Sequence, residues 1–300
     1  MASPFFSSCT HLSPLSQRPA PYPRFPVPEA LAPQWRPLAA GYCPGLDYFE
    51  ARVAEPRLEI RALRVDLMEP GLRIVVNAGE EGAGKGPAGI IPSIKVSSFV
   101  RRYGCAVGIN ANPFRPVSGK EGEDRTIVGI AAADGVPAAL PAPPYDALVF
   151  YTNRRAAILA QAEIDPALLG RKITHAVGGF FRVLEAGEVP GAVLREGAPR
   201  HPRSAAGLSA DGAVLYLLVI DGRRPGSIGA TEGEIGILLK RLGAWEGLNF
   251  DGGGSSALAL RFPDGKVRTV NTPIHNGIPG RERGVAACLG IAPLLPAAGP

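Results

Sequence analysis

Cysteine is scarce in this 300-residue chain, and no two of its four cysteines have the Cys-x-x-Cys spacing of a zinc knuckle or a thioredoxin-like redox site. They lie at Cys9, Cys43, Cys105 and Cys288. Because Cys105 and Cys288 sit inside apolar runs, we expect both to be buried thiols. A disulfide between them is the alternative if the protein is exported.

The motifs of several common enzyme classes are also missing. The four histidines, at positions 11, 175, 201 and 275, show no His-x-x-x-His spacing. The chain has neither a Gly-x-Ser-x-Gly elbow nor a Walker-type phosphate loop. These absences disfavour a histidine metal site, a serine-triad hydrolase and a P-loop nucleotide-binding protein.

Long apolar runs and blocks of one charge are absent as well. No run of about 18 uncharged apolar residues occurs, so no membrane span is predicted. The N-terminus lacks the basic and apolar regions of a signal peptide, and none is predicted. The net charge of +5 follows no long run of lysine or arginine, so nucleic acid is not an expected partner. A locally basic, anion-binding cleft accounts for the charge equally well.

Glycine, proline and hydrophobic residues are plentiful. The chain has 38 glycines, 31 prolines and 46% hydrophobic residues, which predicts a substantial core built from many short strands. Residues 1–37 are rich in proline and are excluded from the fold as a flexible leader. A β-rich segment is expected at 38–92, with a glycine-rich loop at 79–89, and the main domain at 93–293.

Hydrophobic patterning adds detail to this outline. The apolar positions of residues 58–67 change phase after Ala62, which predicts a strand with a bulge or two strands meeting. Ser93 is expected to cap a short helix that Gly104 ends.

The clearest helix is predicted at 232–242, where Thr231 and Glu234 form a capping box and Gly243 ends the helix. This helix joins strands at 213–220 and 247–250. Strands dominate elsewhere and helices are few. The predicted fold class is therefore α+β, with a mixed, twisted β-sheet.

Both strands of this unit end at an aspartate. The first stops at Asp221-Gly222-Arg223, and the second stops at Asp251. Two strands joined by a right-handed crossover helix tend to lie parallel and close together, which would bring both carboxylates to one edge of the sheet. Either Asp-Gly pair alone is more typical of a turn, but together they favour a site.

Three glycines, Gly252, Gly253 and Gly254, follow Asp251 and precede Ser255. A tight hairpin needs fewer glycines, so the run favours close approach of the backbone to a ligand, with the turn amides facing a phosphate or sugar oxygen. Arg203, Arg223 and Arg283 carry planar guanidinium groups suited to a phosphate. Each of them alone is more often a surface residue.

The order of these motifs resembles the phosphodiester glycosidase family over roughly residues 95–292. The resemblance rests on six segments: His201-Pro-Arg-Ser-Ala, the strand ending in Asp221-Gly-Arg, Gly226-Ser-Ile-Gly-Ala-Thr231, residues 238–244, Leu248-Asn-Phe-Asp-Gly-Gly-Gly-Ser-Ser256 and Glu282-Arg283. Two earlier segments match in part. Residues 109–114 keep Asn110 and Phe114 of an Asn-Gly-Gly-Phe-Phe block, and residues 176–179 keep Gly178 and Gly179 before an unusual Phe180-Phe181.

The resemblance implies a phosphodiester-glycosidase-like fold, with residues 93–293 as the catalytic domain. It implies an extracytoplasmic hydrolase that cleaves a glycosyl 1-phosphodiester, with an N-acetylglucosamine-like sugar, or a related glycosidic bond. The expected partner is thus a small molecule or glycan that carries a phosphodiester. The alternative is a non-catalytic carbohydrate- or phosphate-binding protein of the envelope or of exopolysaccharide.

The candidate site residues follow from the motifs and the resemblance together. The candidate catalytic residues are Asp221, Asp251 and Glu282. The candidate substrate-binding residues are Asn110, Gly178, Gly179, Arg203, Arg223, Asn249, Gly252, Gly253, Gly254, Ser255 and Arg283. The cofactor is unknown: a divalent cation held by the three carboxylates fits their chemistry, although no motif requires it.

Overall fold

The computed structural model describes residues 36–37, 44–78, 89–117 and 120–294. Most of the predicted leader and residues 79–88 of the predicted glycine-rich loop lie outside these ranges. Arg36–Pro37, at the end of the predicted leader, pairs with the first long strand.

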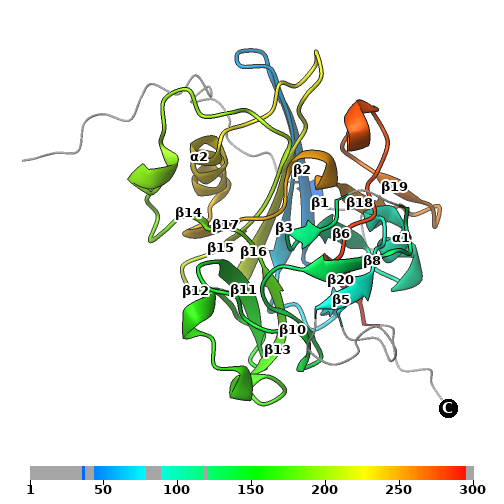
Figure 1. Ribbon diagram of the computed structural model, residues 1–300, viewed down its shortest axis with the longest axis vertical. Coiled ribbons are helices and arrows are strands. Elements are labelled where there is room, and N and C mark those ends of the chain that lie inside the picture. The colour runs from blue at the N-terminus through cyan, green and yellow to red at the C-terminus, as the bar shows by residue number, and fades with distance from the viewer. Residues whose placement is uncertain (1–35, 38–43, 79–88, 118–119, 295–300) are drawn as a thin grey trace, which may run out of the picture.

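Four sheets build the molecule (Figure 1). The largest contains, in spatial order, β1 (Arg36–Pro37), β2 (Leu46–Val53), β3 (Leu58–Asp66), β16 (Val214–Ile220), β15 (Arg203–Leu208), β17 (Glu246–Asn249) and β14 (Arg182–Leu184).

The three smaller sheets lie beside it. One orders β10 (Val136–Ala139), β9 (Ala131–Ala133), β13 (Ile173–Gly178), β11 (Asp146–Tyr151) and β12 (Ala156–Ala160). Another orders β19 (Val267–Thr269), β18 (Leu258–Arg261), β6 (Val107–Asn110), β20 (Cys288–Pro293) and β4 (Leu72–Val76). The smallest orders β5 (Ile90–Pro92), β8 (Asp124–Ile127) and β7 (Phe114–Arg115).

The described residues contain two α-helices, α1 (Val96–Arg102) and α2 (Glu232–Leu242). Short 3₁₀ turns complete the fold: η1 (Gln161–Glu163), η2 (Pro166–Leu168), η3 (Gly191–Val193), η4 (Gly253–Ser255) and η5 (His275–Gly277). Neither α-helix is long and apolar enough to cross a membrane.

The predicted fold class needs correction. Every pairing between named strands is antiparallel, so the protein is sheet-rich and mostly antiparallel rather than α+β with a mixed sheet. The physical reason lies in the strand–helix–strand unit. Its two strands, β16 and β17, are parallel, but β15 lies between them and pairs with both in the antiparallel sense.

The phase change in residues 58–67 does not mark a bulge. β3 pairs with β2 and β16 in unbroken register. Leu58, Ile60 and Ala62 face one apolar cluster, and Leu63 and Val65 face another. The apolar positions therefore switch face because a single strand passes between two cores.

The two helices begin in different ways. The Thr231–Glu234 capping box of α2 is present, and Gly243 ends the helix with a positive φ of 108°. At α1 the predicted cap is wrong, because the Ser93 hydroxyl donates to the carbonyl of Lys120 and the helix starts after Lys95. Cys105 and Cys288 are buried free thiols, as expected.

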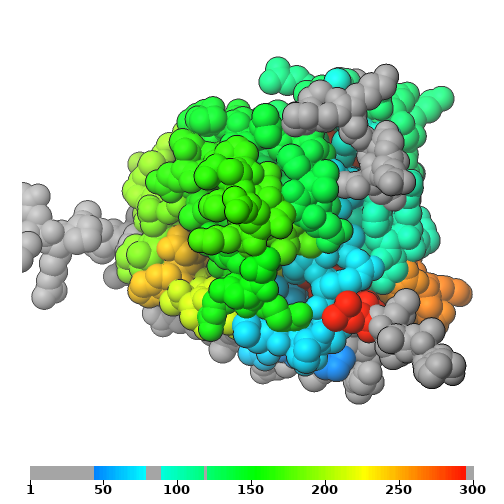
Figure 2. Space-filling view, turned by 90° about the horizontal axis from the view of Figure 1, so that it is seen from below, coloured from blue at the N-terminus to red at the C-terminus, as the bar shows by residue number. Residues whose placement is uncertain are grey.

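A cavity of about 480 Å³ lies at the end of β3, where Val65 and Asp66 pair with the first residues of β16. Its lining comes mainly from the sheet that contains β11 and β13 and from the β3–β4 region. Figure 2 views the molecule from below, where these green and cyan segments meet. None of the predicted site residues lines this cavity. It lies at the opposite end of β16 from Asp221.

Candidate active site

Asp221 and Asp251 leave the main sheet at the same edge. Ile220 pairs with Arg203 at the start of β15, and Asn249 pairs with Ala205. Because β15 separates the two strands, their ends lie about two strand spacings apart, roughly 10 Å. The two strand ends therefore lie at the same edge of the sheet, as predicted, but β15 lies between them.

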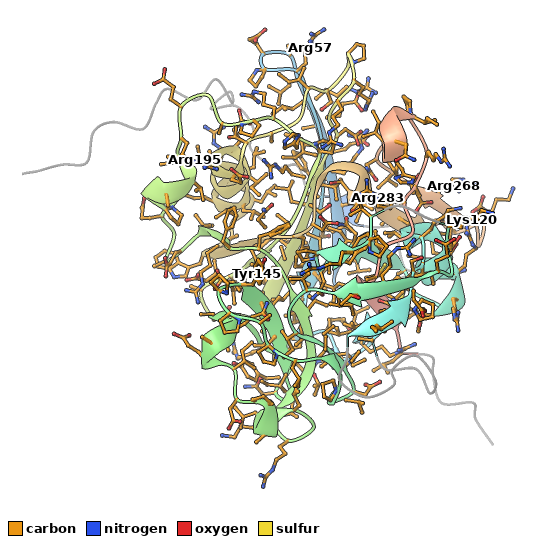
Figure 3. The ribbon with its side chains drawn as sticks, viewed as in Figure 1. Arg57, Lys120, Tyr145, Arg195, Arg268 and Arg283 are labelled. Atoms are coloured by element: carbon orange, nitrogen blue, oxygen red, sulfur yellow. The ribbon has the colours of Figure 1, made fainter. Side chains whose placement is uncertain are left out.

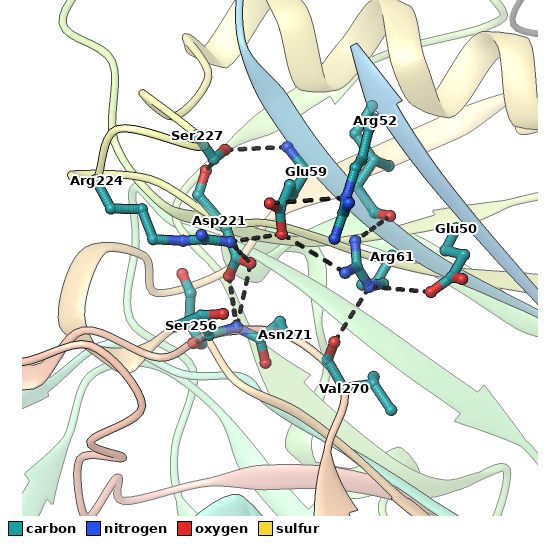
Figure 4. A network of polar contacts seen from close by, with 12 residues as sticks. Glu50, Arg52, Glu59, Arg61, Asp221, Arg224, Ser227, Ser256, Val270 and Asn271 are labelled. Carbon is teal, nitrogen blue, oxygen red and sulfur yellow. Dashed lines mark hydrogen bonds and ion pairs between the residues drawn. The ribbon is translucent and has the colours of Figure 1, made fainter. Parts of the chain in front are cut away.

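Asp221 sits inside a network of polar contacts (Figure 4). Its Oδ2 accepts from Arg224 Nη2 at 2.8 Å, and its Oδ1 accepts from Asn271 Nδ2 at 3.1 Å and from the Thr272 amide at 2.9 Å. Only 1% of the residue is exposed. A carboxylate enclosed and satisfied in this way is suited to holding loops together rather than to meeting a substrate.

The network continues away from the site. Arg224 also donates to Glu59 Oε2 at 2.6 Å, and Glu59 lies 3.6 Å from Arg61. The Asp221 carbonyl accepts from Ser227 Oγ at 2.6 Å, and the same hydroxyl accepts from the Glu59 amide. Asp221 therefore ties the end of β16 to β3 and to the loop that contains Asn271.

Asp251 has a different environment. Burial raises the pKa of its carboxyl group to about 6, although the Ser255 hydroxyl, the Arg283 guanidinium and the Gly252 amide act in the opposite direction. Its backbone is held on both sides, because its amide donates to Ala111 O and its carbonyl accepts from Asn110 Nδ2 at 2.6 Å. The result is a carboxyl group on a backbone held at both ends, with a pKa well above that of an ordinary aspartate.

The glycine run makes room for two arginines. A methyl group at Gly253 would lie 3.0 Å from Arg223 Nη2, and one at Gly254 would lie 2.5 Å from Arg283 Nη2. Gly253 also has a positive φ of 62°, which favours glycine. Two of the turn amides, those of Gly253 and Ser255, donate to the carbonyls of Pro202 and Gly252. The run thus brings guanidinium groups against the backbone beside Asp251.

Arg283 links the glycine turn to a histidine. Its Nη1 donates to Ser255 Oγ at 3.1 Å, and its Nε donates to His275 Nδ1 at 3.1 Å. Burial and the charge of Arg223 lower the pKa of Arg283, while Asp251 raises it. Arg283 therefore lies within electrostatic reach of both Asp251 and Arg223.

The other two predicted arginines differ in their contacts. Arg203 is buried, donates from Nε to the Ala230 carbonyl at 2.9 Å and pairs with Glu232 at 3.2 Å, so its charge is already neutralised. Arg223 has a positive φ of 59°, and its Nη2 lies 3.5 Å from His201 Nδ1. Among the described residues, Arg223 forms no ion pair with a carboxylate.

The predicted asparagines have separate roles. Besides holding Asp251, Asn110 accepts from Ser204 Oγ at 2.7 Å and from the Ala257 amide at 3.1 Å, so it joins three segments of the site. Asn249 is 2% exposed, and its Oδ1 has no hydrogen-bond partner in the part of the chain that is described.

Gly178 and Gly179 allow close packing beside these residues. A methyl group at Gly178 would lie 2.7 Å from Asn112 Nδ2, and one at Gly179 would lie 2.7 Å from the Asn249 carbonyl. A larger side chain at Gly178 would therefore displace Asn112, and one at Gly179 would displace the end of β17.

Glu282 lies apart from the two aspartates in its interactions. Its Oε2 accepts from the Ser97 amide at 3.0 Å, so it holds the first turn of α1. Across residues 44–78, 89–117 and 120–294, no three acidic, histidine or cysteine side chains are grouped to hold a metal ion. The predicted cation site formed by Asp221, Asp251 and Glu282 is therefore not present as a cluster.

His201 and His275 were not among the predicted site residues. Burial and neighbouring guanidiniums lower the pKa of both, with Arg203 and Arg223 acting on His201 and with Arg283 and Arg281 acting on His275. Neither has metal-ligand spacing, and His275 lies outside the segments that carry the family resemblance. Only the fold brings them next to Arg223 and Arg283.

The sequence model of the phosphodiester glycosidase family matches residues 103–292. The chain belongs to the phosphodiester glycosidase family. No curated protein sequence matches it. The match includes all predicted site residues and begins at the end of α1.

Two solved structures share the fold of this phosphodiester glycosidase family member. One is the catalytic domain of zebrafish N-acetylglucosamine-1-phosphodiester alpha-N-acetylglucosaminidase, auto-inhibited by its pro-peptide, with a TM-score of 0.62 and 16% identity over 85% of this chain and 86% of that one. The other is a hypothetical protein from Synechocystis, with a TM-score of 0.58 and 14% identity over 84% of this chain. This chain spans 62% of the length of the Synechocystis protein.

Proposed function

We propose that the protein is a hydrolase that cleaves the bond between a sugar and the phosphate of a glycosyl 1-phosphodiester. The observation that carries this proposal is the position of Asp251, a carboxyl group of raised pKa, beside a glycine turn against which the guanidiniums of Arg223 and Arg283 lie. Membership of the family and the name of its zebrafish relative support the choice of an N-acetylglucosamine-like sugar.

The chemistry of the phosphate leaving group suggests which residues bind it and which residue acts on the water. When the bond between the anomeric carbon and the phosphate oxygen breaks, the leaving group is a phosphomonoester, which is stable as an anion and needs little protonation. Arg223 and Arg283 would bind its oxygens and stabilise the charge that develops on them. Gly253 and Gly254 would serve by letting both guanidiniums reach the turn.

Asp251 then acts as the base. A water molecule attacks the anomeric carbon, its proton passes to the Asp251 carboxylate, and the electron pair of the broken bond leaves with the phosphate. A pKa of about 6 leaves the carboxylate mostly ionised at pH 7 and makes it a stronger base than an ordinary aspartate. The same negative charge would stabilise the cationic character of the sugar in the transition state.

The remaining predicted residues support this arrangement. We assign Asp221, Asn110 and Arg203 as positioning residues. Asp221 accepts from Arg224, the neighbour of Arg223, and Asn110 donates to the Asp251 carbonyl. Arg203 donates to the carbonyl of Ala230, which pairs with His201. Asn249, with its unpartnered buried Oδ1, is the best candidate among the asparagines for contact with a sugar hydroxyl. We assign Glu282 to the start of α1 rather than to chemistry.

A product analysis tests the proposal. Purified protein is incubated with a set of glycosyl 1-phosphodiesters and UDP-sugars, and mass spectrometry in ¹⁸O-labelled water identifies the bond that breaks. We expect the label on the sugar, because water attacks carbon. Label on the phosphate would mean cleavage of a phosphorus–oxygen bond and would overturn the mechanism.

The matched control is Asp251→Asn. We expect this variant to fold and to bind the diester without releasing sugar. Binding without turnover by the unmodified protein as well would favour a non-catalytic carbohydrate- or phosphate-binding function.

A further inference from the structure

A second polar cavity lies directly beside Arg283. It has a volume of about 370 Å³, and its lining includes Lys95, Lys120, His275 and Arg281. Figure 3 labels Arg283 and Lys120, which come from the C-terminal segment and from the loop before β8. Gly280, Glu282 and Gly284 also line the cavity, so the chain on both sides of Arg283 borders it.

His275 joins this cavity to the candidate active site. It lines the cavity, and its Nδ1 accepts from Arg283 Nε at 3.1 Å. The other edge of the same guanidinium donates to Ser255 Oγ, which in turn interacts with Asp251. A continuous chain of contacts through His275, Arg283 and Ser255 thus connects the cavity to Asp251.

The carboxylates of the cavity are already engaged. Glu121 accepts from the Lys95 amide at 2.8 Å and pairs with Lys95 Nζ at 3.5 Å. Glu282 accepts from the Ser97 amide. Both therefore hold the chain at the start of α1.

Two cations remain. Lys120 and Arg281 are exposed, and neither side chain has an ion-pair partner among the residues described. The charge of Arg281 also reaches His275, whose pKa it lowers. A polar cavity with two unpaired cations is complementary to an anion.

We infer that this cavity binds an anionic group on the aglycone, the alcohol that leaves attached to the phosphate. The inference rests on the proposed function and names its substrate class: a diester with a second phosphate or a carboxylate on the aglycone. The first phosphate lies against Arg223 and Arg283, and the second anion meets Lys120 and Arg281.

Two diesters of the same sugar test this subsite, one with glycerol as aglycone and one with glycerol phosphate. The unmodified protein should cleave the second with a higher kcat/KM. The double variant Lys120→Gln, Arg281→Gln should lose about tenfold in kcat/KM on the anionic substrate and little on the neutral one. Equal loss on both substrates, or no preference in the unmodified protein, would overturn the inference.

A matched control removes two charges elsewhere. Arg171 and Lys172 are exposed at the start of β13, and the double variant Arg171→Gln, Lys172→Gln carries the same change in net charge. It should keep the preference for the anionic substrate. If it loses the preference too, long-range attraction rather than a subsite is responsible.

Product binding separates this inference from the proposed function. Calorimetry compares glycerol monophosphate with glycerol bisphosphate as ligands of the unmodified protein. Tighter binding of the bisphosphate, lost in the Lys120 and Arg281 variant, supports the subsite even if no diester is cleaved. If diesters are cleaved but the two products bind equally well, the proposed function stands and the inference of an anion subsite is wrong.

Discussion

The ends of β16 and β17 carry the same Asp-Gly sequence and point to the same edge of the sheet, yet they provide two different kinds of carboxylate. At Asp221 an arginine, an asparagine and a backbone amide fill the acceptor positions of a side chain that is 1% exposed. At Asp251 burial is only partly offset by Ser255, Arg283 and Gly252, and the pKa rises to about 6. The surroundings, rather than the residue type, separate a structural aspartate from the one that we propose as the base.

The largest expected effect of a single change is at Asp251. Asp251→Asn keeps the shape of the side chain and removes the base, so kcat/KM should fall by about 10²- to 10⁴-fold. Steady-state kinetics on a cleavable diester measures the loss, and the melting temperature should stay close to that of the unmodified protein. Near-normal turnover of this variant would mean that Asp251 is not the base.

Asp221→Ala should give the opposite pattern. Removing this buried carboxylate leaves Arg224 with Glu59 alone and takes away the acceptor of the Thr272 amide. The free energy of unfolding should therefore fall by about 3–5 kcal/mol. Chemical denaturation measures this value. If the protein that remains folded has lost turnover as completely as Asp251→Asn, then Asp221 takes part in the chemistry.

The dependence of activity on pH offers a test without mutation. Because the base must be ionised, kcat/KM should rise with pH through about 6 and then level off. At pH 5 it should be about one tenth of its value at pH 7. An optimum below pH 5 with a decline above it would indicate that Asp251 acts in its protonated form.

The smallest effect on stability is expected for a change in α2, the helix that joins β16 to β17. Thr231→Ala removes the side-chain half of the capping box of α2 and should cost about 1 kcal/mol of stability. Neither Asp221 nor Asp251 touches Thr231, so kcat/KM should not change. A clear loss of turnover would show that the position of α2 controls the geometry at the end of β17.

Much of this comparison was accessible from the sequence. The capping box, Gly243 and the alternating strands predicted α2 within its observed bounds, because these signals are local. The two strand ends were predicted to share an edge, which depends only on the two strands running parallel. The family resemblance was confirmed by the match over residues 103–292.

The rest depends on contacts between distant segments. Nothing near β17 in the chain indicates that it pairs with β15 rather than directly with β16, and so the sheet was expected to be mixed. Likewise, Asn271 and Thr272 lie 50 and 51 residues after Asp221, and only the folded chain brings them to its carboxylate. His275 was not predicted because it belongs to no motif itself, and only the fold brings it to Arg283 and to the cavity.

The path of β3 between two apolar clusters has a consequence for how the protein unfolds. Leu58, Ile60 and Ala62 belong to one core, and Leu63 and Val65 belong to the other, within a single strand that pairs on both sides. Neither core can open without breaking the hydrogen bonds of the strand that it shares. The two cores should therefore exchange their slowest amide protons together, as one cooperative unit.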